Sequence, residues 1–259
     1  MQNLGEDIVL LAIKRNGTIA AYDRLRFALA GSELVRLAEA RRIDVDQDGY
    51  IDILDTSPTG NALTDTALAA LEDATRPLEA EKWVARQPPA LVNMYLTHLT
   101  GAGSIRAEDR KVLGLFRIRR WIVVDTARLT DAKDRLDAIA STTGPVTREQ
   151  AAFGGLVHAA GLAVWLYPKR TDLAERDRLR AIARQDETIE IVNDALASAT
   201  SAVDTATDAT ANAAIQAAMW SSIRSSVNAT HHAAAQHHPT GQTGGAHHSG
   251  GGAAGGHHG

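Results

Sequence analysis

Apolar residues recur at helical spacing through most of the first 185 residues of the chain. Near the N-terminus Ile8, Leu11 and Ile13 follow the acidic residues Glu6 and Asp7, which is typical of the first turn of a helix. The same spacing predicts helices over residues 4–14, 23–42, 61–74, 79–85, 90–99, 130–140, 147–167 and 172–185, with a break near Gly154-Gly155 in the seventh. The chain is therefore predicted to be mainly α.

The pattern changes between Ile43 and Asp55, where two interpretations compete. In the first, this segment is a calcium loop, because its aspartates occupy most ligand positions of an EF-hand and Gly49 occupies the sixth. These aspartates are Asp44, Asp46, Asp48, Asp52 and Asp55. The last of them stands where a longer glutamate normally supplies two oxygens. In the second interpretation, β-branched residues on both sides of a glycine-containing turn form a β-hairpin.

The residues that follow favour the hairpin. An EF-hand needs a second helix that starts inside the loop, and Pro58 and Gly60 prevent a helix there. We therefore predict a hairpin, with a calcium ion on the clustered aspartates as the alternative.

The most basic stretch of the chain is Ile105–Ile122. Read as a helix capped by Ser104, it has an apolar side and a charged side that contains six cations. The cations are Arg106, Arg110, Lys111, Arg117, Arg119 and Arg120. They could form a solvated face that pairs with Glu108 and Asp109, or an anion site that holds a phosphate by charge-assisted hydrogen bonds.

Composition narrows the possible functions. The 259 residues are 44% hydrophobic, which is enough for a core, and the net charge of −4 argues against general affinity for nucleic acid. The chain has no cysteine, which suits a cytoplasmic protein, and it has no apolar run long enough to span a bilayer. Any membrane contact is expected to be peripheral, on the inner face. Catalytic signatures are also missing, and His98 and His158 fall inside predicted helices, so we expect no enzyme activity.

The C-terminal third differs from the rest of the chain. Residues 1–185 are predicted to form one helical domain, and the Ala-, Thr- and Ser-rich residues 186–227 a marginal helical extension anchored by Trp220. Residues 228–259 are rich in Gly, Ala and paired His, and are predicted to be disordered. The His pairs could bind a transition metal, or they could be an untuned polar tail.

Several blocks, in order, resemble the Golgi phosphoprotein 3 family. Residues 4–14 resemble its opening helix, and residues 31–43 the helix that leads into a hairpin. The hairpin ends in Ser57-Pro58-Thr59-Gly60 before a further helix, and Lys82-Trp83-Val84 resembles a short segment after the next helix. The resemblance covers roughly residues 1–185 and implies a mainly helical domain with one or two short β-hairpins. The composition of the tail and the lack of cysteine favour a bacterial, actinobacterial-type source.

The resemblance also implies a function. Members of this family are peripheral membrane proteins that bind phosphatidylinositol 4-phosphate. For this chain we expect no cofactor. Their site uses an aromatic residue and an arginine near the start of the second helix, and two arginines three apart on a later helix. In this chain the early pair falls at Ala21 and Ala30, with Tyr22 adjacent to the first, and the later pair falls at Arg106 and Asp109.

The candidate headgroup residues are therefore Arg106, Arg110, which is adjacent to Asp109, and Tyr22. They would form a degenerate site for an anionic phospholipid headgroup. The family's long membrane-contacting hairpin is expected to shrink to a short one near residues 123–128. Protein partners are expected as well, as for an adaptor. The alternative function is metal binding, through the Asp44–Asp55 loop or the His-rich tail.

Overall fold

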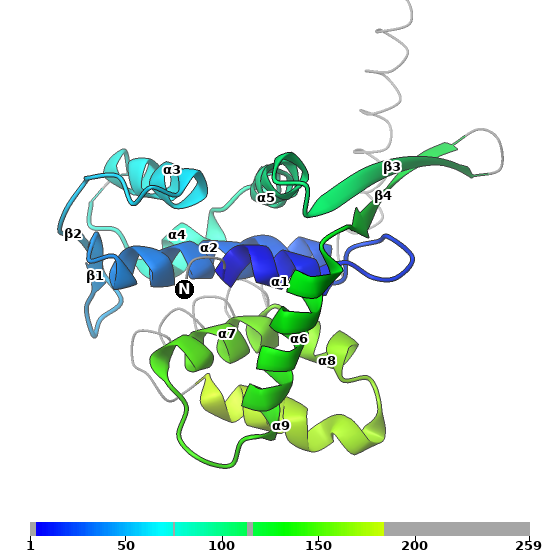
Figure 1. The fold of residues 1–259 in the computed structure, drawn as a ribbon. Coiled ribbons are helices and arrows are strands. Elements are labelled where there is room, and N and C mark those ends of the chain that lie inside the picture. Colours follow the sequence, from blue (N-terminus) through cyan, green and yellow to red (C-terminus); the bar gives the residue numbers. More distant parts are fainter. Residues whose placement is uncertain (1–3, 75, 113–115, 184–259) are drawn as a thin grey trace, which may run out of the picture. The chain divides into compact units, whose positions relative to one another are not determined.

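The computed structural model describes residues 4–74, 76–112 and 116–183, and this part of the chain is mainly α (Figure 1). The helices are α1 (Leu4–Ala12), α2 (Tyr22–Glu39), α3 (Ala62–Glu72), α4 (Ala80–Ala85), α5 (Ala90–Gly101), α6 (Thr126–Ser141), α7 (Arg148–Ala159), α8 (Leu162–Leu166) and α9 (Leu173–Ile182), with a 3-10 turn at Arg170–Asp172. The strands are β1 (Ile43–Val45), β2 (Ile51–Ile53), β3 (Ile105–Val112) and β4 (Phe116–Val123). The fold class is thus confirmed. The predicted extension and His-rich tail lie outside the described residues.

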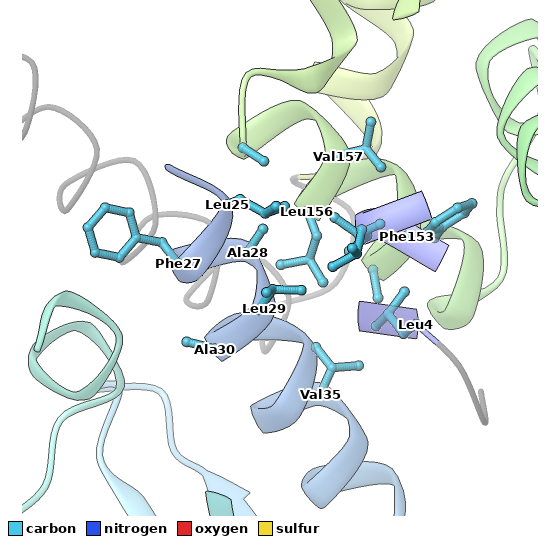
Figure 2. Packing of buried hydrophobic residues seen from close by; sticks show 14 of the residues in the cluster. Leu4, Leu25, Phe27, Ala28, Leu29, Ala30, Val35, Phe153, Leu156 and Val157 are labelled. Carbon is cyan, nitrogen blue, oxygen red and sulfur yellow. The ribbon is translucent and has the colours of Figure 1, made fainter. Parts of the chain in front are cut away.

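Helices α1 and α2 form the centre of the core. Every residue of α1 is buried, and α2 contacts α1, α3, α4, α5 and α7. Figure 2 shows Leu25 and Leu29 of α2 beside Leu156 of α7. Because α1 is covered on all sides, its polar residues must find partners inside the protein.

Strands β1 and β2 pair as the predicted antiparallel hairpin, with Val45 opposite Ile51. The side chains of Ile43, Val45 and Ile51 are buried, whereas Asp44 and Asp52 lie opposite each other on the exposed face. Asp46 closes the turn, because its Oδ1 accepts hydrogen bonds from the backbone N–H groups of Asp48 (3.0 Å) and Tyr50 (2.8 Å). The hairpin interpretation of this segment is confirmed.

The helix predicted over residues 105–122 is wrong. This segment forms the antiparallel hairpin β3–β4, in which Arg106 pairs with Ile122 and Arg110 with Ile118. Ser104 does not cap a helix; its carbonyl accepts hydrogen bonds from the N–H groups of Val124 (2.9 Å) and Asp125 (3.1 Å) at the open end of the hairpin. The prediction of a shortened hairpin near residues 123–128 is wrong as well. The strands have eight residues each, and Arg128 lies in α6.

The break predicted within residues 147–167 lies at another place in the structure. Gly154 and Gly155 do not break the helix but lie buried inside α7. A Cβ on Gly154 would lie 3.1 Å from Leu179 and 3.3 Å from Ile139, so this glycine allows α6, α7 and α9 to pack closely. The break comes at Gly161, which has φ 74° and separates α7 from α8. Gly154 is therefore needed for packing, and Gly161 for the turn between α7 and α8.

Candidate anion-binding surface

The hairpin β3–β4 carries the highest concentration of positive charge in the described residues. Its sequence contains six cations and two acids, a balance of +4 in a chain whose net charge is −4. In Figure 1 the hairpin extends from the end of α5 away from the described helices. Arg106, Arg110, Arg117 and Arg119 are exposed, Arg120 is half-buried, and Ile118 is 41% exposed beside them. This combination of cations and an exposed apolar side chain defines the candidate surface.

The strand geometry of β3 sets the distance between the two predicted headgroup arginines, Arg106 and Arg110. Residues 106, 108 and 110 point to one face of β3 because side chains alternate along a strand. At about 3.3 Å per residue, Arg106 and Arg110 stand roughly 13 Å apart along the strand, whereas a helix would have brought them to about 6 Å. Glu108 lies between them and its Oε1 is 2.6 Å from Arg106 Nη2. On the strand the two arginines are therefore about twice as far apart as on a helix, and an acid stands between them.

On the opposite face a second ion pair crosses the strands. Arg119 Nε lies 3.2 Å from Asp109 Oδ1, and these two residues are direct cross-strand partners. Both ion pairs are exposed, and Arg110 and Arg117 have no carboxylate partner within the ranges described. The hairpin thus keeps cationic groups that are free to meet an external anion.

The base of the hairpin is held by the loop after α1. Trp121 donates its backbone N–H to Gly17 O at 2.8 Å, and Arg120 donates a hydrogen bond from Nη1 to Asn16 O. Gly17 has φ 80°, and a Cβ there would lie 2.7 Å from the Cβ of Arg120. This close approach requires glycine at position 17.

Tyr22, the third predicted headgroup residue, is positioned by α2 and α5. It is the first residue of α2, and its hydroxyl lies 3.4 Å from Asn93 Oδ1 on α5. No hydrogen bond joins it to Arg106 or Arg110 in the part of the chain that the structure covers. The grouping of Tyr22 with the two arginines in one headgroup site stays a prediction.

The aspartates of the proposed calcium loop are also dispersed. Asp46 is used by the turn, Asp44 and Asp52 lie on the exposed face, and Asp55 Oδ2 pairs with Arg42 Nη1 at 2.9 Å. The backbone N–H of Ser57 donates to Asp55 Oδ1, and this bond is the main reason why the pKa of Asp55 is lowered. Within the described ranges no group of three or more acidic or histidine side chains is arranged to hold a metal ion.

Sequence reasoning missed a buried ionic cluster between α1, α5 and α6. The carboxylates of Glu6 and Asp7 are buried rather than exposed at a helix terminus. Arg128 Nη2 lies 2.8 Å from Glu6 and 2.9 Å from Asp7, and Arg135 Nη2 lies 2.6 Å from Asp7. His98 Nε2 completes the cluster at 3.3 Å from Glu6. The spacing of seven residues between Arg128 and Arg135 places both on one helix face, and this was the available signal.

The partners of this cluster change its ionisation. Burial disfavours the charge of Arg128, but hydrogen bonds and charges from Glu6 and Asp7 outweigh it and raise the pKa of Arg128. Nearby, Glu33 on α2 accepts a hydrogen bond from the buried Tyr95 hydroxyl. Burial is the largest influence on Glu33 and raises the pKa of its carboxyl. Its second oxygen has no hydrogen-bond partner among the described residues. The carboxylates of Glu6, Asp7 and Glu33 lie away from solvent, whereas Arg135 reaches Asp7 from the surface with its side chain 44% exposed.

The fold and surface together define a helical domain with a projecting basic hairpin. No helix in the described part of the chain is long and apolar enough to cross a membrane. A model of the Golgi phosphoprotein 3 (GPP34) family matches residues 4–234, and the chain belongs to that family. The resemblance seen in the sequence is thereby confirmed, while the bacterial source stays a prediction. A search among curated proteins found no match.

Proposed function

We propose that this protein is a non-enzymatic, peripheral membrane protein that binds anionic phospholipid headgroups through the hairpin β3–β4. The observation that supports this most directly is the balance of six cations to two acids on an exposed hairpin. Each Lys or Arg held near an anionic bilayer contributes about 1 kcal/mol of binding free energy. Family membership supports a cytoplasmic, membrane-associated role of this kind.

The spacing of the arginines determines the kind of recognition we propose. A phosphomonoester such as that of phosphatidylinositol 4-phosphate is best held by several cations that converge on it. Arg106 and Arg110 are separated along β3 and Glu108 stands between them. The hairpin is therefore proposed to respond to the charge density of the bilayer more than to one headgroup. Tyr22, whose hydroxyl lies 3.4 Å from Asn93 Oδ1 on α5, is not needed for recognition of this kind.

Sedimentation of the full chain with liposomes tests this proposal. Three liposome compositions are compared, namely neutral lipid, neutral lipid with phosphatidylserine, and neutral lipid with phosphatidylinositol 4-phosphate at equal total charge. We expect binding to both anionic compositions and none to neutral lipid. Binding should fall steeply between low and physiological salt, because exposed charges are screened beyond about 8 Å.

The variants compare equal changes in charge at two places. Arg106→Ala/Arg110→Ala should weaken binding roughly tenfold, since two charges near the surface are lost and one of them was paired. Arg86→Ala/Arg180→Ala removes two exposed arginines, one directly after α4 and one on α9. The liposome binding of this variant should stay within about twofold of that of the native chain. Equal losses in both double variants would contradict a role for the hairpin. Strong preference for phosphatidylinositol 4-phosphate at equal charge would contradict recognition by charge density.

A further inference from the structure

A separate pocket of about 740 Å³ lies between the end of α1, the loop that follows it, α6 and α8. Its walls include Leu11, Ile13, Leu129, Trp165, Leu166 and Pro168. The volume lies within the range of sites that hold small organic ligands, and such sites are mostly apolar with a few placed polar groups. The hairpin proposal does not use this pocket, and Leu11 and Ile13 of its lining belong to the hydrophobic core.

The charged residues of the pocket are predominantly cationic. Lys14, Arg15 and Lys133 line it, and Asp134 is the one acid in its lining. Lys133 already has a carboxylate partner, because its Nζ pairs with Asp137. The same Nζ lies 4.8 Å from the centre of the Tyr167 ring. Lys14 and Arg15 have no carboxylate partner in the described part of the chain. Among the described residues, two cations in the lining of this pocket therefore have no carboxylate counter-ion.

Trp165 marks the other notable property of the site. It is 45% exposed, and Val164 beside it is 62% exposed, which is unusual for large apolar residues of one short helix. The Lys14 ammonium lies 4.4 Å from the centre of the Trp165 ring, so the cation and the aromatic face are held together at the opening. A ligand could thus meet a positive charge and an apolar surface at the same place.

We propose that this pocket binds an amphipathic anion, that is, a molecule in which one anionic group is joined to an apolar body. Lys14 and Arg15 would hold the anionic group, and Leu129, Trp165 and Leu166 would cover the apolar body. Either a phospholipid or a free organic phosphate or carboxylate offers this chemistry. The inference does not depend on the hairpin proposal, since the pocket is formed by other residues.

The pocket nonetheless adjoins the hairpin through one loop. Asn16 lines the pocket, and its carbonyl accepts the hydrogen bond from Arg120 of β4. Lys14 and Thr18 pair across the same turn, with Lys14 N–H 2.8 Å from Thr18 O. The loop that carries the pocket's free cations is therefore the loop that holds the base of the hairpin.

Calorimetric titration of the full chain with octyl phosphate, below its micelle-forming concentration, tests the proposal. Inorganic phosphate supplies the anion alone and octanol the apolar body alone. We expect octyl phosphate to bind at least tenfold more tightly than either, because both parts of the pocket are needed. Saturable change of tryptophan fluorescence, lost in Trp165→Phe, should place the ligand at this pocket. Equal affinity for octanol and octyl phosphate would overturn the proposal.

Charge variants make the test specific. Lys14→Gln/Arg15→Gln should weaken octyl phosphate binding roughly tenfold or more, because charge-assisted hydrogen bonds are lost. The matched control is Lys169→Gln, an exposed lysine that does not line the pocket, and it should bind within about twofold of the native chain. Thermal unfolding of each variant confirms that the fold is kept, as expected for residues at the surface. Unchanged affinity in the double variant would contradict the site.

Two further arms separate the ligand source and the two proposals. Soluble dihexanoyl phosphatidic acid is compared with octyl phosphate, and tighter binding of the first assigns the pocket to a phospholipid. Arg106→Ala/Arg110→Ala should leave octyl phosphate binding unchanged while it weakens sedimentation with liposomes. If liposome binding fails altogether but octyl phosphate still binds, only the hairpin proposal is lost.

Discussion

Two sets of arginine–carboxylate pairs in this protein have the same chemistry and opposite surroundings. In the cluster between α1 and α6, the side chains of Glu6 and Asp7 are 5% exposed and that of Arg128 is 19% exposed. On the hairpin, Arg106 is 63% exposed and its partner Glu108 47%. The first set joins helices that are far apart in the sequence, and the second joins neighbouring residues of one hairpin.

The difference in exposure determines the role of each set. Loss of one partner in the buried set leaves a charge without compensation in a medium of low dielectric constant. In the exposed set, water and salt replace a lost partner, and the pair contributes little to stability. Hairpin arginines can therefore exchange an internal carboxylate for an external anion, whereas Arg128, at 19% exposed, is held between two buried carboxylates.

The largest expected effect is on the buried set. Arg128→Ala should lower the free energy of unfolding by about 3 kcal/mol or more, because Glu6 and Asp7 are left buried without their main cation. Arg106→Ala should lower it by less than about 1 kcal/mol. Urea denaturation of both variants measures the difference. Similar losses in the two variants would break the comparison.

Next in size is the packing around α1. A Cβ on Gly5 would lie 2.5 Å from the Tyr95 hydroxyl and 2.6 Å from Ser32 Oγ, so Gly5→Ala should destabilise the protein by about 1 to 3 kcal/mol. Gly101→Ala is the control, because nothing lies within 4 Å of its Cβ position in α5, and alanine should be neutral or favourable there. The midpoints of thermal unfolding report both effects. A stable Gly5→Ala variant would mean that α1 packs loosely.

A smaller effect concerns pH and Glu33. Because burial raises its pKa in the folded protein, Glu33 favours the folded state fully only below its unfolded pKa. That contribution is lost as the pH rises through the folded pKa. Glu33→Gln cannot ionise, so the stability of the native chain relative to this variant should fall as the pH is raised from about 4 to 8. Asp55 and Asp65, whose pKa values are lowered, act in the opposite direction but are common to both proteins. A pH-independent difference between the two proteins would contradict the pKa direction.

The smallest effect on stability is expected on the hairpin. Asp109→Asn removes the partner of Arg119 and should change the free energy of unfolding by less than about 0.5 kcal/mol. It should also strengthen binding to anionic liposomes roughly fivefold, since one negative charge near the bilayer is removed. Reduced liposome binding would contradict this expectation, and would show that Asp109 holds Arg119 in the position that binds lipid.

Local sequence patterns predicted much of this fold, because most segments follow one periodicity. The helices of the first hundred residues and the β1–β2 hairpin were recognisable from their spacing, their turn residues and the Pro58 and Gly60 breakers. The stretch Ile105–Ile122 was misassigned because its apolar residues also fit a helix. Strict alternation in Phe116-Arg117-Ile118-Arg119 is the feature that indicates a strand there. That error placed the candidate arginines on one face of a helix, whereas in the structure they lie on a strand.

Contacts between segments that are far apart in the sequence could not be predicted from local patterns. Acidic residues at a helix start look exposed in sequence, and only the packing of α6 against α1 shows that Glu6 and Asp7 are buried. The pocket beside Trp165 likewise combines α1, α6 and α8, three segments that no local spacing connects. Sites built from a single segment were therefore easier to predict than those shared between segments.

The buried cluster also has a consequence for synthesis of the chain. Arg128 and Arg135 reach Asp7 across separations of 121 and 128 residues. At roughly 5 to 20 residues per second, ribosomes add those residues only about 6 to 26 seconds after the first helix has been made. During that interval Glu6 and Asp7 lack their partners Arg128 and Arg135. Burial of the two carboxylates without these partners would be unfavourable. We expect the N-terminal helix to dock late, although it is translated first.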